Sequence, residues 1–290
     1  MNIFILQTVN IILYWLGGIA LGAFLKTYQK NNENRLFLKL LSNKKILPML
    51  IISSILGAAS PITLFGIIPL IYSVDLKRNK KLESILLAFI TSSILISPNI
   101  FVFTFSLGAD IAIIRMISAI TTGVMMGLIS DIMLSSNESF LFLRKDKKQK
   151  ISEHSKNKDN KFKVFLKNYY NAFKKTGINL LIGVAISFLV FAFVPQSFYD
   201  FAFKSNAVAV PVSAVLSTFF YQCGGGSMPI LQQLLREGLS TGAAITFMLV
   251  GPLTKITNLA ALKSIMTTKK LLIYCSILLV YMLSLGWFLG

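Results

Sequence analysis

The chain has 290 residues, of which 54% are hydrophobic and only 14% charged. A soluble domain carries about 25% charged residues, so this composition excludes an ordinary soluble enzyme and a disordered chain. Lys and Arg outnumber Asp and Glu by 29 to 11, for a formal net charge of +18. Because most basic residues lie between apolar blocks, we expect them to set membrane topology and contact anionic lipids rather than bind nucleic acid.

Long apolar blocks run along the chain. The first, residues 3–25, is about one bilayer wide, with no basic region before it and no small-residue cleavage site after it, so we predict a retained membrane helix. Further blocks follow at 46–74, 82–106, 110–135, 177–195, 205–235, 239–262 and 271–290. This pattern predicts an all-α integral membrane protein of about eight segments, passing several times through the cell membrane.

A hydrophilic stretch at residues 136–176 separates the blocks into two groups. It contains RKDKKQKISEHSKNKDNKFK, which is too polar to bury. We therefore predict a first membrane repeat at 1–135, a basic cytoplasmic linker at 136–176 and a second membrane repeat at 177–290.

The two groups of blocks resemble each other in sequence. Residues 66–70 read GIIPL and residues 226–230 read GSMPI, at an offset of 160. A Pro/Asn pair then follows in both, as SPN at 97–99 and GPLTKITN at 251–258, where Asn99 meets Asn258 across a one-residue gap. Internal duplication of this kind is a common signature of secondary transporters.

Two matching blocks, 46–74 and 205–235, are too long for one straight span. The first has 29 residues, which as a single helix would run about 43 Å against a hydrocarbon core of about 30 Å. Each is interrupted in the middle, by GAASPITLFGIIP and by YQCGGGSMP. Gly and Pro weaken a helix, so both blocks should break at membrane depth, where protein or a water-filled cavity must satisfy the freed backbone.

Two topologies follow from these breaks. If each broken block crosses the membrane, the halves carry four parallel spans each. If each is a re-entrant hairpin, a half has three full crossings and the halves are inverted. The second arrangement places nearly all loop Lys and Arg on one side, which the positive-inside bias favours. We therefore expect inverted repeats with both termini outside, and four parallel spans per half are the alternative.

The pair of breaks is the first candidate substrate site. A half-helix beginning near Ser227 would aim its positive end and several free amides at the second break, which suits an anionic or electron-rich ligand. The alternative is that the glycines only permit close helix packing. The candidate residues are Cys223, Gly224, Gly225, Gly226, Ser227 and Pro229 in the second break, and Pro61, Thr63, Gly66 and Pro69 in the first.

The Pro/Asn elements are the second candidate. Their residues are Gly251, Pro252, Thr254, Lys255 and Asn258, with Pro98 and Asn99 as counterparts. A charge such as Lys255 at that depth costs at least about 2.5–3.5 kcal/mol unless it faces a cavity or a partner. Lys255 would therefore attract an anion or, when neutral, carry a proton; the alternative is that it snorkels to an interface. Arg115 lies five residues after Asp110, so we expect these two to pair at a helix end.

Cysteine, metal and enzyme patterns are sparse. Cys223 is either a soft ligand in the break or a small packed residue, and Cys275 is expected to pack in the apolar interior. Asp110, Asp131 and Glu237 fall at block edges, and the sequence contains no metal-binding or catalytic motif. These features predict no metal site, no cofactor and no enzymatic activity.

At these residues the sequence resembles the predicted permeases related to organoarsenical efflux permeases (ArsP-like). YQCGGGSMPILQQLLREGLSTGAAITFMLVGPLTKITNLAALK is similar to their second block, where a break with Cys and Gly ends in Pro and a G-x-P-x-T-N-like element follows. SPITLFGIIPL is similar to their first block. The resemblance implies a multi-spanning permease that exports small solutes, including trivalent organoarsenicals. The matching residues are Cys223, Gly224, Pro229, Gly251, Pro252, Thr254 and Asn258.

The function expected from the sequence is secondary transport, as efflux, of a small-molecule or ionic substrate by alternating access. Because the first break lacks a cysteine and one thiol cannot form a multi-thiolate site, a small anionic or polar substrate fits Lys255 and the helix ends better. Membrane lipids are expected partners, with a homo-oligomer as a possibility. The alternatives are an intramembrane lipid-modifying enzyme and a non-transporting membrane partner subunit.

Overall fold

A computed structural model describes part of the chain. The described residues are 12, 13, 15–17, 19, 20, 23, 24, 27, 45–60, 80–135, 140, 141, 162–171, 173, 174, 177, 181, 184, 185, 197, 202, 203, 205–221 and 226–290. Across these residues the regular elements are helices, which confirms the all-α expectation. The predicted segments 3–25 and 177–195 fall mostly outside them.

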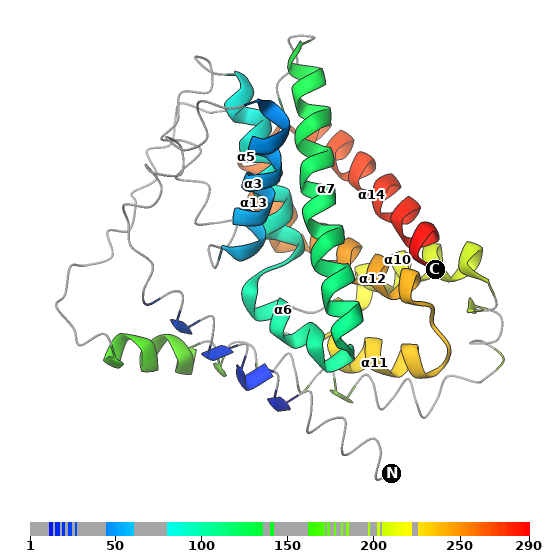
Figure 1. The fold of residues 1–290 in the computed structure, drawn as a ribbon. Coiled ribbons are helices and arrows are strands. Elements are labelled where there is room, and N and C mark those ends of the chain that lie inside the picture. The colour runs from blue at the N-terminus through cyan, green and yellow to red at the C-terminus, as the bar shows by residue number, and fades with distance from the viewer. Residues whose placement is uncertain are drawn as a thin grey trace.

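The described helices form two groups that contact each other (Figure 1). The first comprises α3 (Ile46–Ala59), α5 (Lys80–Leu95), α6 (Pro98–Thr104), the 3-10 helix η1 (Phe105–Leu107) and α7 (Ala109–Ser135). The second comprises α10 (Asn206–Phe220), α11 (Met228–Arg236), α12 (Thr241–Thr254), α13 (Ile256–Lys263) and α14 (Thr268–Leu289). Within them α3, α5 and α7 pack together, as do α10, α12 and α14; α12 joins the groups by contacting both α5 and α7.

Two helices are long and apolar enough to cross a bilayer by themselves. They are Ala109–Met133 of α7, with 25 residues, and Thr268–Leu289, with 22; about 20 are needed. The bent pairs α5–α6 and α12–α13 raise this number to 4 if each pair is one span, and α3 and α10 are shorter apolar helices. These values refer to the described residues, so about eight segments stays a prediction.

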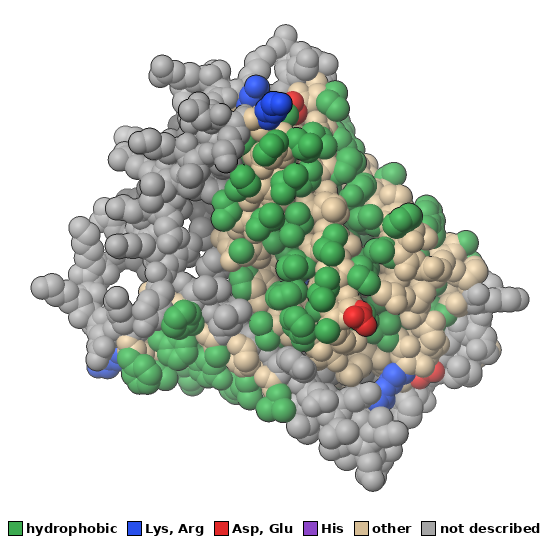
Figure 2. Space-filling view, viewed as in Figure 1, with side chains coloured by type: hydrophobic (Ala, Val, Ile, Leu, Met, Phe, Trp, Pro, Cys, Tyr) green, Lys and Arg blue, Asp and Glu red, His purple; other side chains and the backbone are tan. Residues whose placement is uncertain are grey.

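The outer surface of the bundle is apolar. Ile113, Ile117 and Ile132 on α7 are exposed, as are Leu47 and Ile55 on α3. Figure 2 shows such side chains as a broad green face, with charged side chains toward its ends. In water a face of this size would be costly, whereas lipid tails solvate it, so the packing agrees with a membrane-embedded bundle.

The helix order of the first group recurs in the second. The pairs α3 and α10, α5 and α12, and α7 and α14 begin at Ile46 and Asn206, Lys80 and Thr241, and Ala109 and Thr268, each about 160 positions apart. The bent pair α5–α6 likewise corresponds to α12–α13. The repeat of sequence therefore coincides with a repeat of helices. Whether the halves are inverted stays a prediction.

The predicted interruption of residues 205–235 is confirmed. Helix α10 ends at Phe220, Tyr221 is extended with φ −71° and ψ 113°, and α11 begins only at Met228. In the matching block α3 ends at Ala59, and residues 61–79 lie outside the described part. Within the predicted linker, residues 162–171 are helical and expose Phe162, Leu166 and Tyr170. The assignment of 136–176 as a cytoplasmic linker stays a prediction. Exposed apolar side chains beside lysines are also features of helices that lie at a membrane interface.

Glycines let the helices approach closely. A Cβ atom on Gly123 of α7 would lie 2.0 Å from Ser92 Oγ and 2.9 Å from the Ala88 carbonyl oxygen, both on α5. A Cβ atom on Gly242 of α12 would lie 2.0 Å from the carbonyl oxygen of Gly286 on α14. Small residues at membrane helix interfaces permit this backbone proximity, so these positions fix the spacing inside each group.

The contact between α12 and α14 gives the first testable prediction. Gly242→Ala should lower the midpoint of thermal unfolding by about 5 °C, because the added methyl meets backbone atoms that cannot rotate away. The measurement is thermal unfolding of the purified chain in detergent. The matched control is Gly17→Ala, whose Cβ would have Val102 Cγ1 at 3.9 Å, an ordinary contact. Equal midpoints for the two variants would contradict the packing described.

Candidate functional site

The α12–α13 junction is built by its own side chains. Pro252 has no N–H, so the carbonyl oxygen of Met248, four residues earlier, loses its usual partner within the helix. Thr254 Oγ1 donates back to the carbonyl oxygens of Val250 and Gly251 at 3.0 and 3.3 Å. Asn258 Nδ2 donates to the carbonyl oxygen of Pro252 at 2.8 Å. The predicted residues Pro252, Thr254 and Asn258 therefore hold a bend of 49° between the two helices.

The α5–α6 junction is the counterpart in the first group. Helix α5 ends at Leu95, and α6 begins with Pro98 in its first turn, where a missing N–H costs nothing. The two helices are bent by 46°. The backbone of Asn99 belongs to α6, while its side chain lies outside the described part of the structure. The Pro/Asn elements that the sequence offered as a candidate substrate site therefore lie at the two junctions.

Arg115 connects the two junctions. Its side chain is 0% exposed. Nη1 donates to Thr104 Oγ1 at 2.7 Å, and Nη2 donates to the carbonyl oxygens of Leu95 at 3.4 Å and Met248 at 3.5 Å. The guanidinium thus contacts the ends of α5 and α6 in one group and the carbonyl that Pro252 frees in the other.

The expected pairing of Arg115 with Asp110 is wrong. Asp110 is exposed near the start of α7, whereas Arg115, less than two turns later, points into the interior. In the described part of the chain no carboxylate contacts the guanidinium, and its buried Nε has no hydrogen-bond partner. A single basic residue inside an apolar span was itself a signal of function. The position of Asp110 five residues earlier suggested an ion pair instead, so Arg115 was not predicted as a functional residue.

Tyr221 provides a further contact to Arg115. Its phenol lies close enough to the guanidinium to interact with it electrostatically. The ring lies against α12 at Gly251, where a Cβ atom would be 2.3 Å from Tyr221 Cδ2 and 2.6 Å from its Cβ. Gly251, predicted as a substrate residue, therefore has a clear packing role here, since it makes room for the ring that reaches Arg115.

Tyr274 occupies the position in α14 that Arg115 occupies in α7. Each is the seventh residue of its helix, counted from Ala109 and from Thr268, and each is 0% exposed. The hydroxyls of Tyr274 and Thr91 lie 2.8 Å apart. Thr91 lies on α5, in the opposite group. Arg115 of the first group therefore contacts the bent helix α12 of the second, and Tyr274 of the second group contacts the bent helix α5 of the first.

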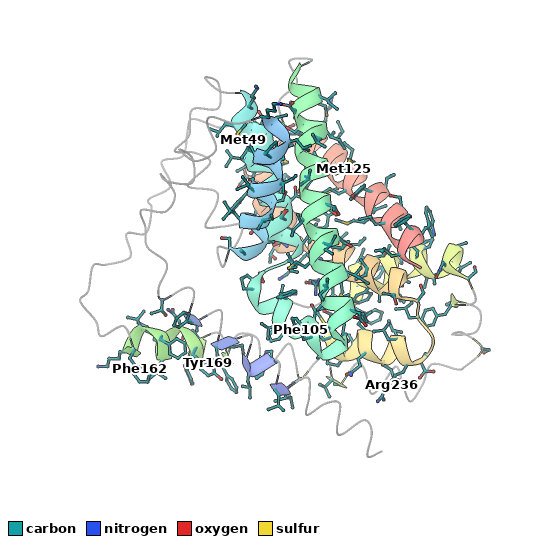
Figure 3. The ribbon with its side chains drawn as sticks, in the orientation of Figure 1. Met49, Phe105, Met125, Phe162, Tyr169 and Arg236 are labelled. Atoms are coloured by element: carbon teal, nitrogen blue, oxygen red, sulfur yellow. The ribbon has the colours of Figure 1, made fainter. Side chains whose placement is uncertain are left out.

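The remaining predicted residues are only partly placed. Gly226, Ser227 and Pro229 are buried where α11 begins, and Lys255 is half-buried between α12 and α13. Helix α11 contacts η1 near the N-terminal end of α7. Figure 3 shows Arg236 at the end of α11 and Phe105 near the N-terminal end of α7. Cys223, Gly224, Gly225, Pro61, Thr63, Gly66 and Pro69 lie outside the described residues. Whether the two Gly/Pro breaks meet stays a prediction.

The described residues contain no group of three or more His, Cys, Asp and Glu side chains that could hold a metal ion. Glu83 is engaged elsewhere, since its Oε1 accepts the backbone N–H groups of Phe140 and Leu141, the latter at 2.9 Å. The polar centre of the described bundle is therefore made of Arg115, hydroxyls and freed carbonyls.

Comparisons with known proteins agree with this architecture. Residues 1–290 match the ArsP_1 family, described as a predicted permease. The chain is also 23% identical over 134 residues to UPF0718 protein MJ0584 of Methanocaldococcus jannaschii, an alignment that covers 46% of this chain and 37% of that protein. No solved structure matches. The family match over the whole length, together with apolar helices broken at matching places, shows that this chain is a membrane protein belonging to the ArsP_1 family of predicted permeases.

Proposed function

We propose that the chain is a secondary permease that exports a small solute by alternating access, with its cargo held where the two bent helix pairs approach each other. The observation that carries the proposal is the matched bending of α5–α6 and α12–α13, by 46° and 49°, in helices that contact across the two groups. Transporters commonly bind cargo at such discontinuous helices at a repeat interface. Inverted halves in the cell membrane, with the basic linker in the cytoplasm, complete this proposal.

The hydrogen bonds at the two junctions support a site that can adopt two conformations. Short side-chain bonds from Thr254 and Asn258 close the bend in α12–α13, whereas the bonds from Arg115 to Leu95 and Met248 are long, at 3.4 and 3.5 Å. Hydrogen bonds of that length are weak and exchange readily. One half can therefore move against the other by exchanging these contacts while each bend keeps its shape.

The favoured cargo is a small anionic or polar solute. Lys255 is half-buried at the junction, immediately before the first residue of α13. The N-terminal end of a helix carries a partial positive charge, which adds to the ammonium group of Lys255. Cys223 and the glycines after it would add contacts from the second break. An arsenical or a soft metal ion would need more than the single thiol that Cys223 supplies.

A transport screen with two variants tests the proposal. Cells that express the chain are challenged with small anions, organoarsenicals and soft metal ions, and efflux of each is measured. For a cargo that the wild type exports, Lys255→Ala and Asn258→Ala in proteoliposomes should lower the flux by about tenfold or more, through lost attraction and a loosened bend. The control is Lys263→Ala, an exposed residue at the end of α13. Unchanged flux in both variants would remove these residues from the site, and an absence of flux for every compound would count against a permease.

A further inference from the structure

Arg115 presents an electrostatic problem that the proposed transport does not explain. A guanidinium cannot lose its charge in a protein, and burying an ion without compensation costs several kcal/mol. Arg115 is fully buried, and among the described residues it contacts no carboxylate. Within the described part of the chain, groups other than an acid must balance this charge.

The carbonyl groups of the two broken helices provide that balance. Leu95 is the last residue of α5, where carbonyl groups have no partner within the helix, and Met248 lost its partner to Pro252. The C-terminal end of a helix carries about half a negative charge. The guanidinium lies at the end of α5 and at a freed carbonyl within the last two turns of α12, so both helices offset part of its positive charge.

The same geometry argues against Arg115 as the group that captures an anion. An anion beside Nη2 would lie next to the carbonyl oxygens of Leu95 and Met248, which repel it. Thr104 Oγ1 accepts from Nη1 and donates its own hydrogen to the Ile100 carbonyl oxygen at 2.8 Å, so it too presents an oxygen to the guanidinium. A ring of oxygen atoms of this kind suits a cation.

We propose that the guanidinium of Arg115 is a permanent cation of the protein. It occupies the place, between the two bent helix pairs, where other transporters hold a bound Na⁺. In such transporters unwound carbonyls and half-helix C-terminal ends coordinate the coupling ion. Here the charge is covalently attached to α7, so this place needs no metal ion. The comparison with Na⁺-binding transporters rests on the proposed transport function, whereas the compensation of the Arg115 charge by carbonyl groups does not.

The proposal predicts that removing the side chain creates a cation site. Arg115→Ala leaves the oxygens of Leu95, Met248 and Thr104 around an opening of guanidinium shape. The midpoint of thermal unfolding should fall by about 5–10 °C, because buried carbonyl groups lose their partner. Millimolar guanidinium chloride, far below the molar range that unfolds proteins, should restore at least half of that loss. Na⁺ should restore less, because it lacks the planar set of donors.

The experiment is thermal unfolding of the purified full chain in detergent, with guanidinium, sodium and choline chlorides at equal ionic strength. The matched control is Tyr274→Phe, which removes a buried polar contact at the equivalent position but no charge. Its midpoint and that of the wild type should not respond to guanidinium. A rise in Arg115→Ala no larger than in these two proteins would overturn the proposal.

A second pair of variants keeps the test decisive if Arg115→Ala does not fold. Arg115→Lys keeps the charge, whereas Arg115→Gln keeps hydrogen-bond donors without it. The lysine variant should unfold at a clearly higher temperature than the glutamine variant; equal midpoints would overturn the proposal. No cargo or transport enters these measurements, so their failure and the failure of the proposed transport function are distinguishable.

Discussion

Replacing Gly251 with alanine should remove most of the transport activity, by about tenfold or more, and lower the midpoint of thermal unfolding by about 5 °C. The new methyl group would overlap Cβ, Cγ and Cδ2 of Tyr221, at 2.6, 2.4 and 2.3 Å. These atoms are close to the backbone, so the whole ring must shift. Its phenol would then leave Arg115, and the contact between the break after α10 and the centre of the bundle would be lost.

A double-mutant cycle checks this explanation. Tyr221→Gly removes the phenol contact together with the ring and Cβ, so Gly251→Ala in that background has no Tyr221 side chain to displace. We expect the double variant to unfold at a temperature close to that of Tyr221→Gly, so that the two changes are strongly non-additive. Additive losses of stability would show that Gly251 matters for a reason other than the ring. Flux of the cargo found in the transport screen is measured on the same proteins.

Pro252→Ala should act in the opposite direction on stability. Alanine supplies the missing N–H, which can bond the Met248 carbonyl oxygen and complete the helical ladder of α12. The midpoint of thermal unfolding should stay equal or rise. Transport should fall by about tenfold, because the new bond competes with Arg115 for Met248 and straightens the helix. If the Pro252→Ala protein stays folded but no longer transports, the bend is needed for transport itself and not only for stability.

The matched control for this substitution is Pro211→Ala. Pro211 also lies inside a helix, α10, but this helix belongs to neither bent pair. Its replacement should leave the flux within about twofold of the wild type. If Pro252→Ala transports as well as Pro211→Ala does, the bend in α12–α13 is not needed for transport.

The Pro/Asn elements at the junctions could be recognised in the sequence because the causes of the bends are local. Pro98 and Pro252 remove backbone donors wherever they stand, and Asn258 can reach back to a carbonyl only a few residues away. The interruption before Met228 was likewise predicted from a run of glycines followed by proline. Each of these features depends on a few neighbouring residues, so no knowledge of the tertiary structure was required.

The contacts of Arg115 could not be predicted in this way. Met248 lies 133 positions from it, and nothing in either segment specifies the other as its partner. The freed carbonyl at Met248 follows from Pro252, but the donor that occupies it depends on how the two groups pack. Local reasoning instead chose Asp110, the nearest acid, which faces outward. The same holds for Tyr221 and Gly251, which are distant in sequence and meet only through the fold.

The equivalence of Arg115 and Tyr274 has a consequence for how such a protein can arise. If a single repeat paired with an identical copy of itself, both copies would bring the same side chain to the shared boundary. Two guanidiniums would double the positive charge there, and two phenols would leave the carbonyls of Leu95 and Met248 without a cation. One charged and one neutral residue require two different halves. Two different halves in one chain therefore provide an asymmetric centre that a pair of identical subunits would lack.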